Sequence, residues 1–424
     1  MRCCRIIVSA MTDRSTRDIV PYLKRFTLDK KGKKKTRIEH VESFGGVYSK
    51  FINEFWTARQ RQSSSLHEIA YRACFKSQLP GFFIELLTKE GDVVYDPFAG
   101  RGTTIIEAAL LGRIVIGNDI NPLARILTLP RLNIPNPKEL EQRLRSIPTN
   151  KKARCELDLT MFYHPDTLKE IISLRNYLVT RKESGQEDLL DFWIRMVATN
   201  RLTGHSSGFF SVYTLPPNQA VSNSAQLKIN RKRGQRPEYR NTRELILKKS
   251  KQLLSGLEKH EAQNLAQVAR SARFFTEDAR HTLEIANNSI QLTVTSPPFL
   301  DVVQYADDNW LRCWFNSIDA DEVASKITAA KTIAEWSKVM LEVFIELYRI
   351  TCRGGWVAFE VGEVKSGRVN LDEYVLPLGM IAGFQCKGIL VNKQRFTKTA
   401  NIWGIHNNTK GTNSNRVVMF LKEQ

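Results

Sequence analysis

The sequence predicts an α/β fold in which a mostly parallel sheet carries helices on both faces. Residues 91–113 contain an apolar strand at 93–95, a glycine turn and a helix at 103–111, and a second strand follows at 114–119. A third buried strand, at 290–294, comes much later in the chain. Strands separated by helices favour parallel pairing, because the chain must cross a face of the sheet between parallel neighbours.

Length and composition limit the class of protein. The chain has 424 residues, 42% hydrophobic and 25% charged, so it can bury a large core and suits two or three domains of about 150 residues each. No apolar stretch reaches the roughly 18 to 20 residues that cross a bilayer, and Arg2 and Arg5 precede too short an apolar run for a secretory signal. Seven cysteines without C-x-x-C spacing indicate a reduced cytoplasmic protein with no metal site.

Positive charge is concentrated in two segments. The chain carries 63 Lys and Arg against 44 Asp and Glu, a net charge of +19, and residues 1–40 and 226–251 each contribute +8. We expect the second segment to bind nucleic acid, because each neutralised phosphate releases counterions. The alternative for both segments is a solvated basic surface. The candidate nucleic-acid-binding residues are Lys228, Arg231, Lys232, Arg233 and Arg236.

A glycine turn follows the first strand. Residues 96–104 read Asp-Pro-Phe-Ala-Gly-Arg-Gly-Thr-Thr, in which Gly100 and Gly102 permit a tight turn and a close approach of the backbone to a ligand. Asp119 ends the second strand 23 residues after Asp96, where a carboxylate can accept hydrogen bonds from ribose hydroxyls. The dinucleotide-binding pattern G-x-G-x-x-G fits less well, since Ile105 takes the place of its third glycine.

The sequence of residues 96–104 resembles the S-adenosylmethionine-binding motif of amino-group DNA methyltransferases. The resemblance implies a Rossmann-like methyltransferase sheet, seven-stranded and mostly parallel, in which Asp119 holds the ribose of the cofactor. It places the methionine end of the cofactor on Asp96, Phe98, Ala99, Gly100, Gly102, Thr103 and Thr104. Asp278 matches the residue that contacts the cofactor adenine in this family, and the alternative for Asp278 is a helix N-cap before His281.

A second motif, Thr-Ser-Pro-Pro-Phe, follows the strand at 290–294. It is similar to the Ser-Pro-Pro-Tyr/Phe active-site motif of enzymes that methylate exocyclic amines, and its Thr-Ser-Pro-Pro form is most associated with cytosine N4. Such an amine is a poor nucleophile because its lone pair is delocalised into the ring, so hydrogen-bond acceptors must make it pyramidal. We assign that role to the hydroxyl of Ser296 and the carbonyl of Pro297, which Pro298 holds rigidly. We expect Phe299 to stack on an extruded base.

The order of the two motifs divides the chain. We expect a basic arm at 1–42, the first part of a catalytic domain at 43–125, an inserted target-recognition region at 126–272 and the second part of the catalytic domain at 273–424. In the last part we expect a strand at 354–362, a helix at 371–382 and a closing strand pair at 388–396 and 416–422.

Together these features predict a site-specific methyltransferase that transfers a methyl group from S-adenosylmethionine to the N4 amine of a flipped cytosine in duplex DNA. The resemblance also implies a restriction-modification system with a cognate restriction endonuclease, and a cytoplasmic location at the nucleoid. Adenine N6 methylation, RNA base methylation and a non-catalytic nucleic-acid-binding role are the alternatives. Carbon-5 methylation is disfavoured, because it needs a nucleophilic Cys that usually follows Pro, and no Pro precedes Cys here.

Overall fold

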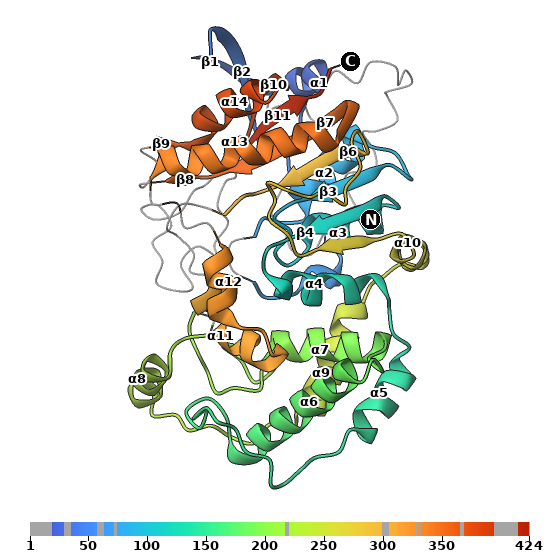
Figure 1. Cartoon of the computed structure of the whole chain (residues 1–424), viewed down its shortest axis with the longest axis vertical. Coiled ribbons are helices and arrows are strands. Elements are labelled where there is room, and N and C mark those ends of the chain that lie inside the picture. Colours follow the sequence, from blue (N-terminus) through green and yellow to red (C-terminus); the bar gives the residue numbers. More distant parts are fainter. Residues whose placement is uncertain are drawn as a thin grey trace.

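One nine-stranded sheet organises the chain (Figure 1). The computed structural model describes residues 19–28, 35–56, 63–71, 74–216, 220–298, 305–327, 330, 332–364, 369–393 and 414–423. The strand order is β1-β2-β10-β11-β7-β6-β3-β4-β5. The strands of this sheet are β1 (Arg37–Ser43), β2 (Gly46–Asn53), β3 (Val93–Asp96), β4 (Ile114–Asn118), β5 (Arg273–Phe275), β6 (Ile290–Thr295), β7 (Thr351–Val361), β10 (Gln385–Lys393) and β11 (Ser414–Leu421).

The sheet is parallel from β7 to β5 and mixed at its other side. The strands β7, β6, β3, β4 and β5 run parallel to one another, whereas β11 is antiparallel to both β7 and β10. The prediction of seven strands is wrong, because the hairpin β1–β2 pairs with β10 and raises the number to nine. A short second sheet pairs β8 (Glu363–Val364) with β9 (Val369–Asn370).

Helices cover both faces of the sheet, as predicted. Side chains alternate along β7: Trp356 and Ala358 join one hydrophobic cluster, and Val357 and Phe359 join the other. The second cluster is closed by α13 (Ile333–Ile350) and α14 (Leu371–Ile381), and the first by α2 (Gln78–Leu87) and α3 (Thr103–Leu110). No helix in the described part of the chain is long and apolar enough to span a membrane.

The region between β4 and β5 is helical in its described residues. Figure 1 shows most helices of this region gathered at the end of the molecule below the sheet, together with α11 (Tyr305–Asn316) and α12 (Ala320–Lys326). The elements of this region are α4 (Pro122–Thr128), η4 (Leu129–Leu132), α5 (Pro137–Ser146), α6 (Pro165–Glu183), α7 (Leu189–Arg201), α8 (Asn223–Arg233), α9 (Thr242–Leu254) and α10 (Lys259–Ala269). The remaining helices are α1 (Ile19–Arg25), η3 (Ser65–His67), α11 (Tyr305–Asn316) and α12 (Ala320–Lys326).

The elements predicted around the two motifs are present. The strands at 93–95, 114–119 and 290–294 correspond to β3, β4 and β6, and the helix at 103–111 corresponds to α3. Downstream, β7, α14, β10 and β11 overlap the segments predicted for them. The strands β7, β10 and β11 begin earlier, at Thr351, Gln385 and Ser414, and residues 394–396 of the predicted strand lie outside the described residues.

Strand order reverses at β3. The chain runs from β3 outward to β4 and β5 on one side, and β6 then pairs with β3 on its other side. At such a switch point the connections leave β3 and β6 in opposite directions, so a crevice opens at the carboxyl ends of the strands. Asp96 ends β3 and Thr295 ends β6, so both predicted motifs begin at this point.

We predict that Gly102→Ala destabilises the fold more than Gly91→Ala does. Both glycines have positive φ, +74° and +82°, so alanine costs about 1–2 kcal/mol at either position. A Cβ at residue 102 would also collide with the side chain of Thr128, whereas nothing lies within 4 Å of a Cβ at residue 91. Overpacking should add about 1–3 kcal/mol. Denaturant unfolding of the two variants measures the difference, and equal destabilisation would contradict the prediction.

Candidate active site at the carboxyl edge of the sheet

The glycine turn is fixed by hydrogen bonds from its own backbone. The N–H of Phe98 donates to Asp96 Oδ1 (3.1 Å), and the N–H of Gly100 donates to Asp119 Oδ2 (2.8 Å). The N–H of Ala99 donates to the carbonyl of Asn118 (2.9 Å). The predicted cofactor residues on β3 and β4 are therefore brought together in one structure.

Two threonines follow the turn at the start of α3. Thr104 is fully buried and donates from its hydroxyl to the carbonyl of Val294 on β6 (3.0 Å). Thr103 accepts from Nε of Arg101 at 3.2 Å. The turn is thus attached to the strand that carries the second motif.

The first and second motifs meet directly. The hydroxyl of Thr295 donates to Asp96 Oδ1 at 2.6 Å, across 199 positions of sequence. Burial raises the pKa of Asp96 from 3.8 to about 7, while hydrogen bonds from Thr295 and the N–H of Phe98 oppose the rise. Ser296, the next residue, therefore has a fixed position relative to the glycine turn.

Asp119 stands immediately after β4, as predicted. Its carboxylate accepts from the N–H groups of Gly100 (2.8 Å) and Asn121 (2.9 Å). Burial raises its pKa from 3.8 to about 6, against these two hydrogen bonds. Beside it, Asn118 exchanges hydrogen bonds with the backbone of Glu277 (2.9 and 3.0 Å), which ties the end of β4 to the segment after β5.

Asp278 is engaged by a neighbouring arginine. Arg280 donates to both carboxylate oxygens of Asp278, with Nη2 at 2.6 Å from Oδ2, and these bonds hold the pKa of Asp278 below its ordinary value. The alternative of a helix N-cap is wrong, since residues 278–285 contain turns and no helix. Glu277, which the sequence analysis did not single out, has a buried carboxylate oxygen without a hydrogen-bond partner in the described residues.

Ser296 is held by a buried carboxyl group on the adjacent strand. Its hydroxyl donates to Oε2 of Glu360 on β7 at 2.6 Å, and Asn415 Nδ2 of β11 donates to Oε1 at 3.0 Å. Glu360 is 7% exposed, and burial raises its pKa. The sequence predicts a strand at Glu360 but no role for its side chain. The available signal was an acidic residue at the carboxyl end of an apolar strand, which is the pattern that identified Asp119.

The two prolines of the second motif are anchored from α13. Trp336 Nε1 donates to the carbonyl of Pro298 at 3.2 Å, and Pro297 is buried. The bond from Trp336 fixes the chain directly after Pro297, whose carbonyl is one of the two acceptors predicted from the sequence. Phe299 lies outside the described residues.

Two arginines hold residues 66–69 beside the glycine turn by hydrogen bonds. Arg101 Nη1 donates to the carbonyls of Ile69 (2.8 Å) and His67 (3.2 Å), and Arg131 Nη1 donates to that of Leu66 (2.9 Å). Arg131 is fully buried, and burial lowers its pKa to about 9. Neither arginine could be identified from the sequence, because no local pattern distinguishes an arginine that binds backbone carbonyls from one that binds a ligand.

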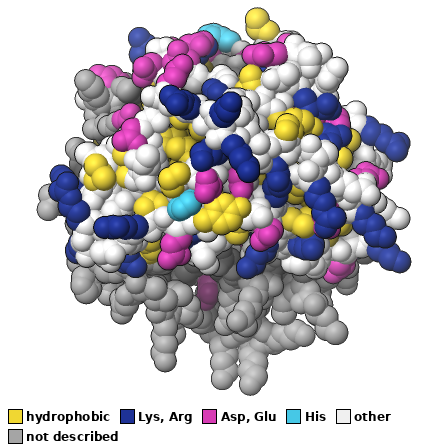
Figure 2. Space-filling model, turned by 90° about the horizontal axis from the view of Figure 1, so that it is seen from below, with side chains coloured by type: hydrophobic (Ala, Val, Ile, Leu, Met, Phe, Trp, Pro, Cys, Tyr) yellow, Lys and Arg dark blue, Asp and Glu magenta, His cyan; other side chains and the backbone are white. Residues whose placement is uncertain are grey.

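The predicted nucleic-acid-binding residues lie on and just after α8. Lys228, Arg231, Lys232, Arg233 and Arg236 are all exposed. Figure 2 looks onto the helical end of the molecule and shows Lys and Arg side chains spread over it among fewer acidic ones.

Two further basic residues of the segment make structural contacts. Arg243 donates to the carbonyl of Ile147 (2.5 Å), and Lys249 is 6% exposed and pairs with Glu68 at 3.5 Å. Positive charge in residues 226–251 therefore includes an exposed group centred on α8 and, on α9, the buried Lys249 beside the exposed Lys248 and Lys251.

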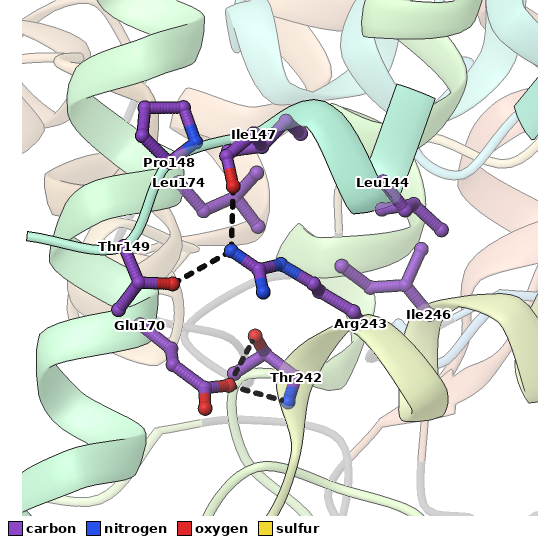
Figure 3. Close-up of a pocket in the computed structure, with 9 residues that line it drawn as sticks. All are labelled: Leu144, Ile147, Pro148, Thr149, Glu170, Leu174, Thr242, Arg243 and Ile246. Carbon is purple, nitrogen blue, oxygen red and sulfur yellow. Dashed lines mark hydrogen bonds between the residues drawn. The ribbon is translucent and has the colours of Figure 1, made fainter. Parts of the chain in front are cut away.

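A small pocket lies between α5, α6 and α9, away from the two motifs (Figure 3). Its polar side chains bond one another: Glu170 accepts from the N–H and hydroxyl of Thr242, both at 2.8 Å, and Arg243 donates to Thr149 Oγ1 at 2.6 Å. The pocket is therefore a feature of helix packing and is separate from the candidate active site.

The residues at the carboxyl edge suit S-adenosylmethionine. Gly100 and Gly102 adopt positive φ, and the ring of Tyr71 would be 3.5 Å from a Cβ at residue 100, so side chains here would fill the turn. Asn121 Nδ2, beside Asp119, is buried and lacks a partner among the described residues. The described residues contain no group of three metal-ligating side chains.

Comparison with known families supports the interpretation of the first motif. Residues 16–126 match the N6_N4_Mtase family model, described as DNA methylase. This match contains the glycine turn and Asp119.

Individual relatives match short parts of the chain. Type II methyltransferase M.MvaI of Kocuria varians is 29% identical over 128 residues, which is 30% of this chain and 25% of that one. The tRNA (guanine(10)-N2)-dimethyltransferase of Methanocaldococcus jannaschii is 29% identical over 149 residues, covering 28% of this chain and 41% of that one. A TehB-like SAM-dependent methyltransferase from Corynebacterium glutamicum has a TM-score of 0.30 and 9% identity over 83% of this chain and 90% of its own. The chain thus spans less than half the length of these two sequence relatives.

We predict that Asp96→Asn gains stability relative to the wild type as pH rises from 3.8 to about 7. The folded protein holds the proton of Asp96 more tightly than the unfolded chain, so wild-type stability falls through that interval. Asparagine retains an acceptor for Thr295 and Phe98 but does not titrate. Thermal unfolding across the pH range measures the difference.

The control is Asp158→Asn, because hydrogen bonds from Thr160 lower the pKa of Asp158. That variant should lose stability relative to the wild type as pH rises through the range below 3.8. A pH-independent difference for Asp96→Asn would show that the carboxyl group of Asp96 does not titrate as its burial implies.

Proposed function

We propose that the chain, whose residues 16–126 match the N6_N4_Mtase family model described as DNA methylase, methylates the exocyclic N4 amine of a flipped cytosine in duplex DNA. The observation that carries the proposal is the 2.6 Å hydrogen bond between Thr295 and Asp96, which joins the glycine turn to the residue preceding Ser296. A methyl donor in the turn and an amine at Ser296 would therefore be neighbours.

S-adenosylmethionine is the cofactor of this proposal. When bound, it supplies an electrophilic methyl group on a sulfonium sulfur. Asp96 and the turn 98–104 would hold its methionine end, and Asp119 would accept hydrogen bonds from its ribose. Arg280 engages both carboxylate oxygens of Asp278, and Asp278 would contact the adenine amine through its remaining lone pairs.

Ser296 and Pro297 supply the acceptors that an exocyclic amine needs. Because the hydroxyl hydrogen of Ser296 points to Glu360, the lone pairs of Ser296 Oγ remain available for an amine N–H. The carbonyl of Pro297 provides the second acceptor. Two acceptors in fixed positions favour a pyramidal nitrogen whose lone pair faces the methyl donor.

Glu360 is the positioning residue behind Ser296. The amine loses one proton for each methyl group it gains, so a proton must leave the site. A proton passed from the amine to Ser296 Oγ, with the hydroxyl proton of Ser296 moving to Glu360 Oε2, leaves Ser296 neutral and Glu360 protonated. Burial raises the pKa of Glu360 and favours this protonated form.

The exposed cations of α8 would hold the DNA backbone. We assign target recognition to residues 126–272, with the catalytic parts at 43–125 and 273–424. Phe299 retains the predicted role of stacking on the extruded base, where stacking of about 1–3 kcal/mol offsets much of the cost of flipping. A cognate restriction endonuclease is a further part of this proposal, since M.MvaI is named a type II methyltransferase.

Methylation of RNA is the second candidate. It is favoured by the similarity to an enzyme named a tRNA (guanine(10)-N2)-dimethyltransferase. Guanine N2 is also an exocyclic amine, so the same acceptors would serve it. The two candidates differ in the nucleic acid bound and share the chemistry at Ser296.

We predict that the protein incorporates methyl groups from S-adenosylmethionine into duplex DNA and forms N4-methylcytosine. Digestion of the product and mass spectrometry of the nucleosides identify the base. N6-methyladenine alone would reject cytosine as the target, and incorporation into tRNA without incorporation into DNA would favour the second candidate. A catalytically inactive protein would give none of these products.

We predict that Ser296→Ala reduces kcat by about 10²–10³-fold, as removal of a preorganised hydrogen-bonding group does, with little change in cofactor affinity.

Glu360→Gln should reduce kcat less than Ser296→Ala does, and it should remove the limb of the pH–rate profile that reports ionisation of Glu360. Glu360→Asp should retain more activity than Glu360→Gln, because aspartate keeps the carboxyl group. Single-turnover rates and calorimetric cofactor binding measure these effects. Full activity of Ser296→Ala would exclude Ser296 from the mechanism, and an unchanged pH profile in Glu360→Gln would reduce Glu360 to a structural role.

A further inference from the structure

A rigid polar loop projects between α7 and α8. A bridge between Gly204 and Tyr213 closes it, and the N–H of Thr214 donates to the carbonyl of Gly204 at 3.0 Å. At its tip His205, Ser206 and Ser207 are exposed. Short loops held by a rigid scaffold are common positions for binding residues.

Aromatic packing and two arginines fix the shape of this loop. The ring of Phe209 lies so close to Gly204 that any side chain at residue 204 would collide with it, and Arg201 stacks on the ring with Cζ 3.9 Å from its centroid. Arg240 Nη1 donates to the carbonyls of Ser206 (3.1 Å), Phe209 (2.8 Å) and Ser211. The exposed tip is therefore preorganised, which reduces the entropic cost of binding.

The loop shares a surface with the basic helix α8. Arg233 of α8 stacks on the ring of Tyr213, with Cζ 3.8 Å from its centroid. Gln226 and Gln235 both donate to the carbonyl of Tyr213, at 3.0 and 2.9 Å. A nucleic acid bound by the exposed cations of α8 would therefore lie beside the closing end of the loop.

This surface is also joined to the helix that follows the active-site motif. The N–H of Ala220 donates to the carbonyl of Asp308 (3.0 Å), and Trp310 Nε1 donates to that of Val221 (3.3 Å). Asp308 and Trp310 both belong to α11. Figure 1 places α8, α11 and α12 on the side of the molecule where β8 and β9 follow β7.

We propose that the loop at 204–213 reads base edges of the DNA, with His205 and Ser207 as specificity-determining residues, while α8 supplies phosphate contacts. Hydroxyl and imidazole groups both donate and accept hydrogen bonds, which is what readout of base edges requires. Cations fix the register of the duplex without carrying sequence information. The inference rests on the proposed function, because it takes duplex DNA as the substrate.

Methylation of a randomised duplex library, followed by sequencing of the modified sites, tests the assignment. His205→Ala and Ser207→Ala should each relax the preference at one or two base pairs by about tenfold, as expected when a hydrogen bond to a base edge is removed. The dependence of binding on salt should change little. Combined replacement of Arg231, Lys232 and Arg236 by Gln should keep the recognised motif and reduce the salt slope by about 0.9 for each phosphate that is no longer neutralised. Arg233 is left in place because it holds Tyr213.

The matched control is Gln267→Ala, an exposed polar residue of α10. Figure 1 shows α10 and α8 on opposite sides of the view. The control variant should leave both the motif and the salt slope unchanged. An unaltered motif in both loop variants, at wild-type thermal stability, would overturn the inference. A loop variant that lowers the salt slope without relaxing the motif would overturn it too, by showing that the loop binds phosphate. Absence of DNA methylation by the wild type would instead refute the proposed function.

Discussion

The hydrogen bond between Thr295 and Asp96 is the interaction on which the geometry of the candidate site depends. Both side chains are buried where the strand order reverses, and they end the two central strands β3 and β6. Burying a carboxyl group there is unfavourable unless donors compensate it. Thr295 and the N–H of Phe98 supply those donors. The same hydrogen bonds therefore stabilise the buried carboxyl group of Asp96 and fix the conformation of the glycine turn.

Ser296 consequently stands between two buried carboxyl groups. Asp96 reaches it through Thr295, and Glu360 bonds it directly. In the proposed reaction a cationic donor approaches and positive charge develops on an amine, and nearby carboxyl groups stabilise both. The positive surface that would hold DNA lies elsewhere, on α8. In the proposed reaction, acidic side chains therefore lie beside the reacting atoms, and the exposed basic side chains lie on α8.

The sequence was sufficient for the parts of the fold that local patterns determine. Apolar runs beside a glycine turn predicted β3, α3 and β4, and the strand before Ser296 was predicted in the same way. The hairpin β1–β2 was missed because Arg37–Ser43 is mostly exposed and reads as a polar arm. The pairing of Ser296 with Glu360 could not be predicted, since adjacency of β6 and β7 is a tertiary property. The same applies to Lys249, whose burial depends on how α9 packs.

The helical region and the sheet form one packing unit, and this bears on how recognition would influence catalysis. Trp193 of α7 and Ile246 of α9 belong to the same hydrophobic cluster as Val94 and Leu292 of the sheet. Helix α11, which follows the active-site motif in sequence, also packs against α6 and α7. A shift of the helical region on DNA would therefore be transmitted to α11, because close-packed interfaces deform little. Under the proposed function, DNA bound to the helical region would therefore bear on α11, the helix that follows Ser296 and Pro297 in the sequence.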